Sequence, residues 1–116
     1  MKKLRVATLG LAAAFALLVA APAMAQTTVK VTAGKPGEFR YVLSAKSVKR
    51  GTVTFKVTNA GAIVHDFKIN GKATKVLKKG QSQTITVKFA KPGSYQYVCT
   101  VAGHAAAGMK GVLRVT

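Results

Sequence analysis

Alternation of apolar and polar residues is the dominant pattern along most of this chain. In Thr52–Thr58, the apolar side chains Val53, Phe55 and Val57 alternate with threonines and one lysine. A period of two is the spacing of a strand that buries one face. The same alternation predicts strands at 28–32 and 84–89, and further β-branched or aromatic runs predict strands at 39–43, 63–69, 94–99 and 112–115.

Turn-forming residues separate these runs. Gly, Pro and Asn fall between successive predicted strands, as in the sequences Gly34-Lys35-Pro36-Gly37 and Lys91-Pro92-Gly93. Past residue 25 we find no helical stripe, and only a single helical turn is expected, near 105–107. Seven or eight short strands with regular turns are typical of an antiparallel sandwich or barrel, so the fold class predicted is all-β.

The first 25 residues have the composition of a targeting segment. A short basic start is followed by an apolar run over 6–21, and small residues occupy positions 23 and 25. These are the three parts of a secretory signal peptide with cleavage after Ala25. A transmembrane anchor is disfavoured because Thr8, Gly10 and Pro22 interrupt the run. We therefore predict a signal peptide at 1–25, one domain at 26–116, and a periplasmic or secreted protein.

The chain contains a single cysteine, Cys99. A disulfide within the chain is therefore excluded, although an oxidising compartment would permit one. An unpaired thiol in an exported protein is exposed to oxidation and needs an explanation. Pairing with another molecule is one explanation, and metal ligation is another.

The charge of the chain is strongly positive. Three of its 19 Lys and Arg side chains lie in the predicted leader, which leaves 16 against Glu38 and Asp66, a net charge of +14 for residues 26–116. This charge favours acidic partners or the surface of an anionic membrane. Nucleic acid is disfavoured by the predicted export and by the absence of a dense basic block with interleaved aromatic residues.

Most of the potential metal ligands lie in one segment near the C-terminal end of the sequence. Cys99, His104 and Met109 follow one another at five-residue intervals between two predicted strands, and the only other histidine is His65. A thiolate, two imidazoles and a weak thioether are the ligands of a type 1 copper site. Zinc is a weaker alternative because methionine is a poor zinc ligand. A cysteine nucleophile would need an orienting third residue, which the sequence does not offer.

These motifs resemble the plastocyanin/azurin-like cupredoxins. The resemblance rests on Gly51-Thr52-Val53-Thr54-Phe55, Asn59-Ala60-Gly61, His65-Asp66-Phe67, Pro92-Gly93-Ser94-Tyr95, the 99–109 segment and Gly111-Val112-Leu113-Arg114-Val115. Four residues separate Cys99 from His104 and four separate His104 from Met109. Plastocyanin-like members have a shorter first gap and azurin-like members a shorter second one, so the subfamily stays open.

The resemblance implies an eight-stranded Greek-key β-sandwich that binds one copper ion. His65, Cys99 and His104 correspond to the equatorial ligands and Met109 to the weak axial ligand. His104 corresponds to the ligand that reaches solvent and passes electrons. An apolar rim is expected around it, formed by Gly61, Ala62, Ala102, Gly103, Ala105 and Ala106. Asp66 is expected to support the ligands through Thr100, the alternative being an acid on the strand surface beside Lys68.

The function implied is one-electron transfer by a monomer, with an acidic redox partner such as a cytochrome or an oxidase domain. A copper carrier or buffer on the same fold is the alternative, because a fold does not fix a function. We expect no enzymatic activity, since a copper enzyme would need further ligands and no histidine is left after His65 and His104.

Overall fold

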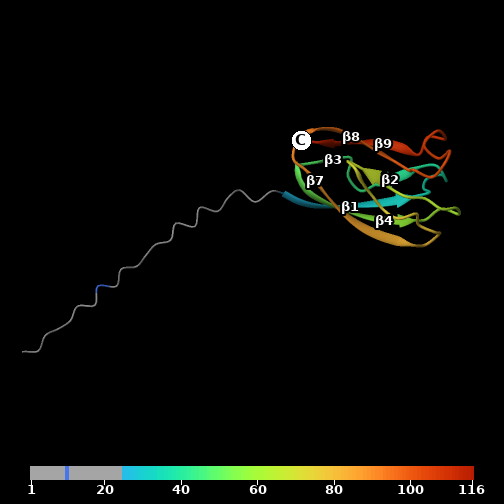
Figure 1. Ribbon diagram of the computed structural model, residues 1–116, viewed down its shortest axis with the longest axis horizontal. Coiled ribbons are helices and arrows are strands. Elements are labelled where there is room, and N and C mark those ends of the chain that lie inside the picture. Colours follow the sequence, from blue (N-terminus) through green and yellow to red (C-terminus); the bar gives the residue numbers. More distant parts are fainter. Residues whose placement is uncertain (1–9, 11–24) are drawn as a thin grey trace, which may run out of the picture.

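The computed structural model describes residue 10 and residues 25–116, and the predicted signal peptide lies outside this range except for Gly10 and Ala25. Strands make up the regular structure of the described residues, with no helix among them (Figure 1). The strands are β1 (Ala25–Ala33), β2 (Tyr41–Leu43), β3 (Ser47–Val48), β4 (Gly51–Asn59), β5 (Lys68–Ile69), β6 (Lys72–Ala73), β7 (Ser82–Phe89), β8 (Gly93–Val98) and β9 (Lys110–Val115). Within this part of the chain, no helix offers the length and apolar character that crossing a membrane requires.

The strands form two sheets that stack face to face. One sheet has the order β2-β1-β4-β7, and the other has the order β3-β9-β8-β5-β6. In Figure 1 the pair β8 and β9 lies above the layer that contains β1 and β4. Strand β1 runs parallel to β4, and β3 runs parallel to β9, whereas the other pairs are antiparallel. The predicted all-β sandwich is confirmed.

The core lies between the two sheets and follows from the alternation in the sequence. Strand β4 shows the burial that its sequence predicts, with Val53, Phe55 and Val57 fully buried. Leu113 of β9 and Phe67, which directly precedes β5, belong to the same core cluster and are also fully buried. Burying one large apolar side chain contributes roughly 1.5–3 kcal/mol, so these residues supply much of the stability that fixes the sandwich.

The segment 63–69 was predicted as one strand, and this prediction is wrong. Only β5 and an isolated bridge between His65 and Leu77 pair there. The backbone N–H of Asp66 points to the Cys99 sulfur at 3.5 Å, and that of Phe67 donates to the Thr74 hydroxyl at 3.1 Å. These groups are therefore satisfied by side chains, and a continuous ladder cannot form.

The number of strands also differs from the eight expected. The described residues form nine, because β3 and β6 are strands of two residues each. Pairs of this length carry too few residues to show an alternating pattern. The helical turn expected near 105–107 is not a helix but a series of turns, in which the Ala107 N–H donates to the Gly103 carbonyl at 3.1 Å and the Gly108 N–H to the Ala105 carbonyl at 3.0 Å.

One end of the sandwich gathers the residues singled out in the sequence. Strands β1 and β4 both end there, at Ala33 and Asn59. Strand β8 ends and β9 begins at the same end, where Val98 pairs with Lys110. The loops that follow β4 and β8 therefore lie at one end of the molecule, and they carry His65, Cys99 and His104. We call this the metal end.

Candidate metal centre

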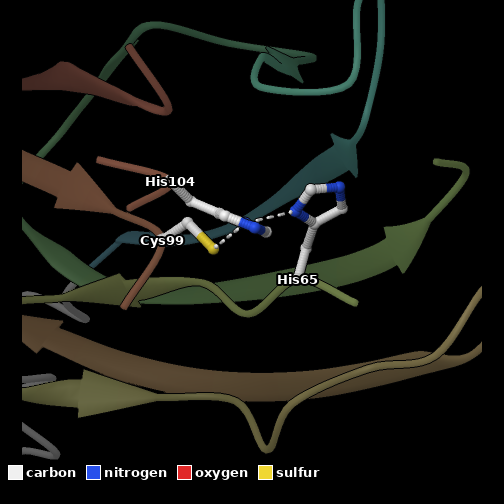
Figure 2. Close-up of side chains that lie close together, drawn as sticks. All are labelled: His65, Cys99 and His104. Carbon is white, nitrogen blue, oxygen red and sulfur yellow. Dashed lines mark hydrogen bonds between the residues drawn. The ribbon is translucent and has the colours of Figure 1, made fainter. Parts of the chain in front are cut away.

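Three potential ligands converge at the metal end. One donor atom from each of His65, Cys99 and His104 lies within 4.8 Å of the other two. The two Nδ1 atoms are 3.1 Å apart, and the Cys99 sulfur lies 3.5 Å from Nδ1 of His104. Figure 2 shows both imidazoles and the thiol directed toward one small space, although His65 comes from a segment 34 positions before Cys99. The fold thus brings together three of the four predicted ligands.

The fourth predicted ligand, Met109, is fully buried beside the same group. It packs in a small apolar cluster with Cys99 and Ala33, against which Tyr41 and Val101 also pack. Its backbone N–H donates to the carbonyl of His104 at 3.0 Å, and its carbonyl accepts the N–H of Cys99 at 3.0 Å. These bonds close the 99–109 loop on itself, which keeps the thioether near the thiol and leaves Met109 a predicted ligand.

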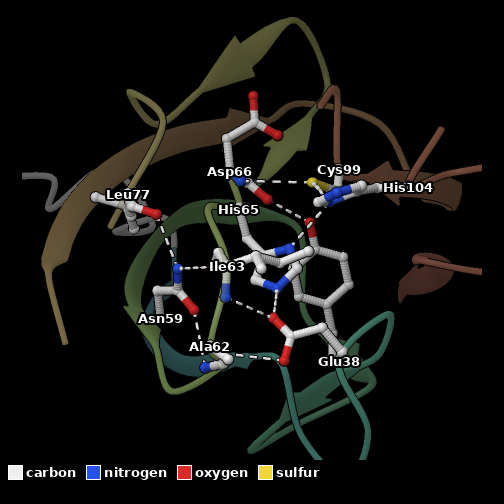
Figure 3. Close-up of polar contacts among 11 residues, drawn as sticks. Glu38, Asn59, Ala62, Ile63, His65, Asp66, Leu77, Cys99 and His104 are labelled. Carbon is white, nitrogen blue, oxygen red and sulfur yellow. Dashed lines mark hydrogen bonds and ion pairs between the residues drawn. The ribbon is translucent and has the colours of Figure 1, made fainter. Parts of the chain in front are cut away.

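The segment that carries His65 is held by Asn59, the last residue of β4. The Asn59 side-chain amide donates to the carbonyls of Ile63 and Leu77, both at 2.8 Å, and its oxygen accepts the N–H of Gly61 at 2.9 Å (Figure 3). Asn59 is fully buried, and its bonds to Leu77 and Gly61 are buried with it. His65 itself exchanges two backbone bonds with Leu77, at 3.1 and 2.7 Å. The segment is therefore fixed on both sides.

Glu38 contacts the outer ring nitrogen of His65, Nε2, on the opposite side of the ring from the atom that approaches His104. Its Oε1 lies 2.8 Å from His65 Nε2, while its two oxygens accept the N–H groups of Ala62 and Ile63, each at 3.0 Å. The two backbone bonds are the main reason that the pKa of Glu38 is lowered to about 2. We did not single out this contact from the sequence. The signal available was the rarity of acids, since Glu38 is one of only two.

Asp66 connects the two ligand-bearing segments. Its Oδ1 accepts the N–H of Thr100 at 2.6 Å, and its Oδ2 accepts the Thr100 hydroxyl. Its own N–H points to the Cys99 sulfur at 3.5 Å. Asp66 is 4 % exposed, so the alternative of an acid on the strand surface is wrong. The contact expected between Asp66 and Thr100 is present, and its value for metal binding remains a prediction.

Burial shifts the pKa of two of the predicted ligands, Cys99 and His104. It raises the pKa of the Cys99 thiol, although the N–H groups of Asp66 and Val101 oppose this shift. It lowers the pKa of His104, with the neighbouring His65 acting in the same direction. A neutral imidazole offers a lone pair to a cation, and a thiol with a raised pKa keeps its proton until a cation replaces it. The arrangement thus suits a metal ion better than a nucleophile.

His104 is the most exposed of the four predicted ligands, at 8 % against 0 or 1 % for the others. The ring of Phe39 lies against it edge to face, with centroids 5.1 Å apart. Of the predicted rim, Ala62, Ala102, Gly103 and Ala106 are exposed and Ala105 is half-buried, whereas Gly61 is buried and does not belong to it. Phe39, Ile63 and Val64 are exposed apolar residues that the sequence analysis missed.

Comparison with known proteins places this arrangement in a family. The model of the cupredoxin-like domain matches residues 7–115. Auracyanin-B of Chloroflexus aurantiacus is 49 % identical over 43 residues, which are 37 % of this chain and 18 % of that protein. The chain therefore spans less than a fifth of this curated relative.

Comparison with solved structures covers a larger part of the chain than the comparison with this relative does. A structure of auracyanin B superposes with a TM-score of 0.65 at 26 % identity, covering 83 % of this chain and 92 % of that one. Reduced auracyanin from Roseiflexus castenholzii gives 0.56 at 27 %, over 81 % and 98 %. Rusticyanin from Thiobacillus ferrooxidans, described as a copper protein, gives 0.66 at 24 %, over 79 % of each chain, and supports the fold alone. The chain belongs to the cupredoxin-like family.

Proposed function

We propose that this protein is a type 1 copper protein that carries single electrons between redox partners. In this proposal His65, Cys99 and His104 hold one copper ion, and Met109 acts as a weak axial ligand. The observation that carries the proposal is the convergence of one donor atom from each of two imidazoles and one thiol within 4.8 Å in a buried site. Membership of the cupredoxin-like family supports it, as does the similarity to auracyanin, which has been solved in a dithionite-reduced form.

The donor set fits copper by its chemistry. Thiolate and thioether favour Cu(I), and imidazole nitrogen is accepted by both oxidation states. When bound, copper supplies a one-electron couple between Cu(I) and Cu(II). The chain's own contribution is to hold the donors in place, through Asn59 and Glu38 on one segment and the closed 99–109 loop on the other. Donors that are held in this way need little rearrangement when the oxidation state changes.

His104 is the only predicted ligand with more than 1 % of its surface exposed to solvent. Small and apolar side chains surround it, including Ala102, Ala106 and Phe39. A shallow apolar surface suits a small, quickly released contact, which is typical of transient redox complexes. We propose that electrons enter and leave through His104.

The charge of the chain supports an acidic partner, such as a cytochrome or an oxidase domain. Residues 26–116 carry 16 cationic side chains, and the carboxylates of Glu38 and Asp66 already make hydrogen bonds at the metal end. Long-range attraction to an acidic protein would raise the association rate at low salt, and added salt would reduce it. The leader-like composition of residues 1–25 supports action outside the cytoplasm, in the periplasm or after secretion.

The test is to add copper to the purified protein and record its visible spectrum. We expect an intense thiolate-to-copper absorption that is lost in Cys99→Ser, and a reversible one-electron midpoint in voltammetry. A surface exchange, Thr28→Ala, serves as the control and should keep both signals. Absence of the absorption in the unmodified protein would contradict the proposal. Rapid transfer of the copper to a chelator, without redox cycling, would favour the copper carrier instead.

A further inference from the structure

Carboxylates are scarce in this chain, and both lie against the predicted ligands. Asp66 is joined to the loop that carries Cys99, and Glu38 is joined to His65. The described residues contain no other ion pair than that between Glu38 and His65, although 16 cationic side chains are present. The location of Glu38 is therefore not explained by pairing with a surface lysine or arginine.

Glu38 is held by more than its contact with His65. It lies in the loop between β1 and β2, and it reaches across to the segment after β4, where it accepts the N–H groups of Ala62 and Ile63 at 3.0 Å. Its side chain is 29 % exposed, whereas His65 is fully buried. In Figure 3 the carboxylate lies between the backbone at Ala62 and Ile63 and the ring of His65. Three donors thus fix the two oxygens.

Two glycines next to this contact allow the β1–β2 loop to approach the segment that carries His65. A Cβ atom on Gly61 would lie 2.5 Å from Glu38 Oε1 and 3.0 Å from His65 Nε2. A Cβ atom on Gly34 would lie 2.4 Å from the Cα atom of Gly61. The contact at Gly34 is with backbone, so glycine is needed there for the two loops to approach, whereas a side chain at Gly61 would have to displace the Glu38 carboxylate. The β1–β2 loop is therefore fitted closely to the segment that carries His65.

We propose, on the basis of the copper function proposed above, that Glu38 is a positioning residue that orients His65 and lowers the reduction potential of the site. With its Nε2 proton donated to Glu38, His65 presents the lone pair of Nδ1 toward Cys99 and His104. Hydrogen bonds from the outer nitrogen of a ligating histidine to a carboxylate fix the tautomer and raise the basicity of the ligand. A negative charge beside the ligand also stabilises the more positive oxidation state of the metal.

Three exchanges of Glu38 separate the effect of orientation from the effect of charge. Glu38→Ala removes every bond that the carboxylate makes, and Glu38→Gln keeps the shape of the side chain but removes the charge. Glu38→Asp keeps the charge on a shorter side chain. The matched control is Thr28→Lys, which makes the same change of one positive unit at an exposed position on β1, far along the strand from its metal end.

The orientation is tested in the metal-free protein. The ¹⁵N shifts of the imidazoles report which nitrogen carries the proton, and the chain has only two histidines to assign. We expect the proton of His65 on Nε2 in the unmodified protein and a mixture of tautomers in Glu38→Ala. An unchanged tautomer in Glu38→Ala would overturn the positioning role. This readout needs no copper, so it remains decisive if the proposed function fails.

The effect on the metal is tested after copper addition. We expect the affinity for Cu(II) to fall about 10- to 100-fold in Glu38→Ala. In Glu38→Gln we expect the ratio of oxidised to reduced protein, at the unmodified midpoint, to fall to about one tenth, which is an upward shift of about 59 mV. Glu38→Asp should recover part of the loss. A shift in Glu38→Gln no larger than that in Thr28→Lys would overturn the role of the charge.

Discussion

The two segments that carry the predicted ligands are held in different ways. The segment 59–65 is held by residues distant in sequence, because Glu38 and Leu77 bond to it from both sides. The 99–109 loop is held mainly by its own backbone, with bonds from Cys99 to Met109, from His104 to Val101 and from Met109 to His104. The first segment therefore depends on the whole sandwich, whereas the second depends largely on its local sequence. Asp66 and Thr100 join the two.

A metal ion that takes ligands from both segments should have the largest effect on stability. With free copper at about 1,000 times its dissociation constant, binding should raise the free energy of unfolding by about 4 kcal/mol. The increase should be much smaller in Cys99→Ser, which removes the soft ligand of the second segment. Thermal unfolding at several copper concentrations measures both. A melting temperature that does not depend on copper would show that the segments are not joined through the metal.

Exchange of two glycines that have the same φ angle compares how much distant contacts and local conformation contribute to stability in the two segments. Gly34 and Gly103 both have φ of 82°, so exchange to alanine strains both by about 1–2 kcal/mol. A Cβ atom on Gly34 would also meet the backbone of Gly61 at 2.4 Å, whereas one on Gly103 would meet nothing within 4 Å. We expect Gly34→Ala to cost about 3 kcal/mol or more, and Gly103→Ala only the strain.

Chemical denaturation of the two metal-free variants measures this difference. Equal losses would indicate that the β1–β2 loop can withdraw from Gly61 at little cost, and the proposed dependence of the first segment on distant contacts would then be wrong.

Exchange of Asn59 tests how much its side-chain hydrogen bonds stabilise the segment 59–65. Exchange to alanine leaves the buried N–H of Gly61 and the carbonyl of Ile63 without their partner, although the carbonyl of Leu77 keeps the N–H of His65. An unsatisfied buried group costs about 1–3 kcal/mol, so we expect a loss of about 2–3 kcal/mol in the free energy of unfolding. The exposed exchange Thr28→Ala should cost less than about 1 kcal/mol. A comparable loss in both variants would contradict the role assigned to Asn59.

Exchange of Asp66 tests the contact between the two segments, and we expect the smallest change in the free energy of unfolding here. Asp66→Ala removes the acceptor of the Thr100 N–H and should cost about 1–2 kcal/mol. Asp66→Asn keeps an oxygen for that N–H and places an amide donor beside the Thr100 hydroxyl, so it should cost less. Urea unfolding of the metal-free variants resolves the order of the two. An equal or greater loss in Asp66→Asn would show that the remaining amide oxygen does not replace the carboxylate as acceptor of the Thr100 N–H.

The same difference between local and distant contacts explains what the sequence could predict. The strands β4 and β7 could be predicted because alternation is a local property of the sequence. Cys99, His104 and Met109 could be predicted as a group of ligands because they lie within one segment of eleven residues. The bond from Glu38 to His65 spans 27 positions and leaves no local pattern. The interrupted strand at 63–69 was missed for a related reason, because the Cys99 sulfur and Thr74 replace the expected backbone partners.

The placement of both carboxylates at the metal end also affects how copies of the protein meet. Residues 26–116 present 16 cationic side chains against two carboxylates, and both carboxylates are already hydrogen-bonded within the chain. Two molecules therefore repel each other at low ionic strength, and salt weakens that repulsion. If the proposed function holds, self-exchange of electrons should accelerate with added salt, while exchange with an acidic partner slows. The charge of the surface would then favour delivery of electrons to unlike proteins over transfer between identical ones.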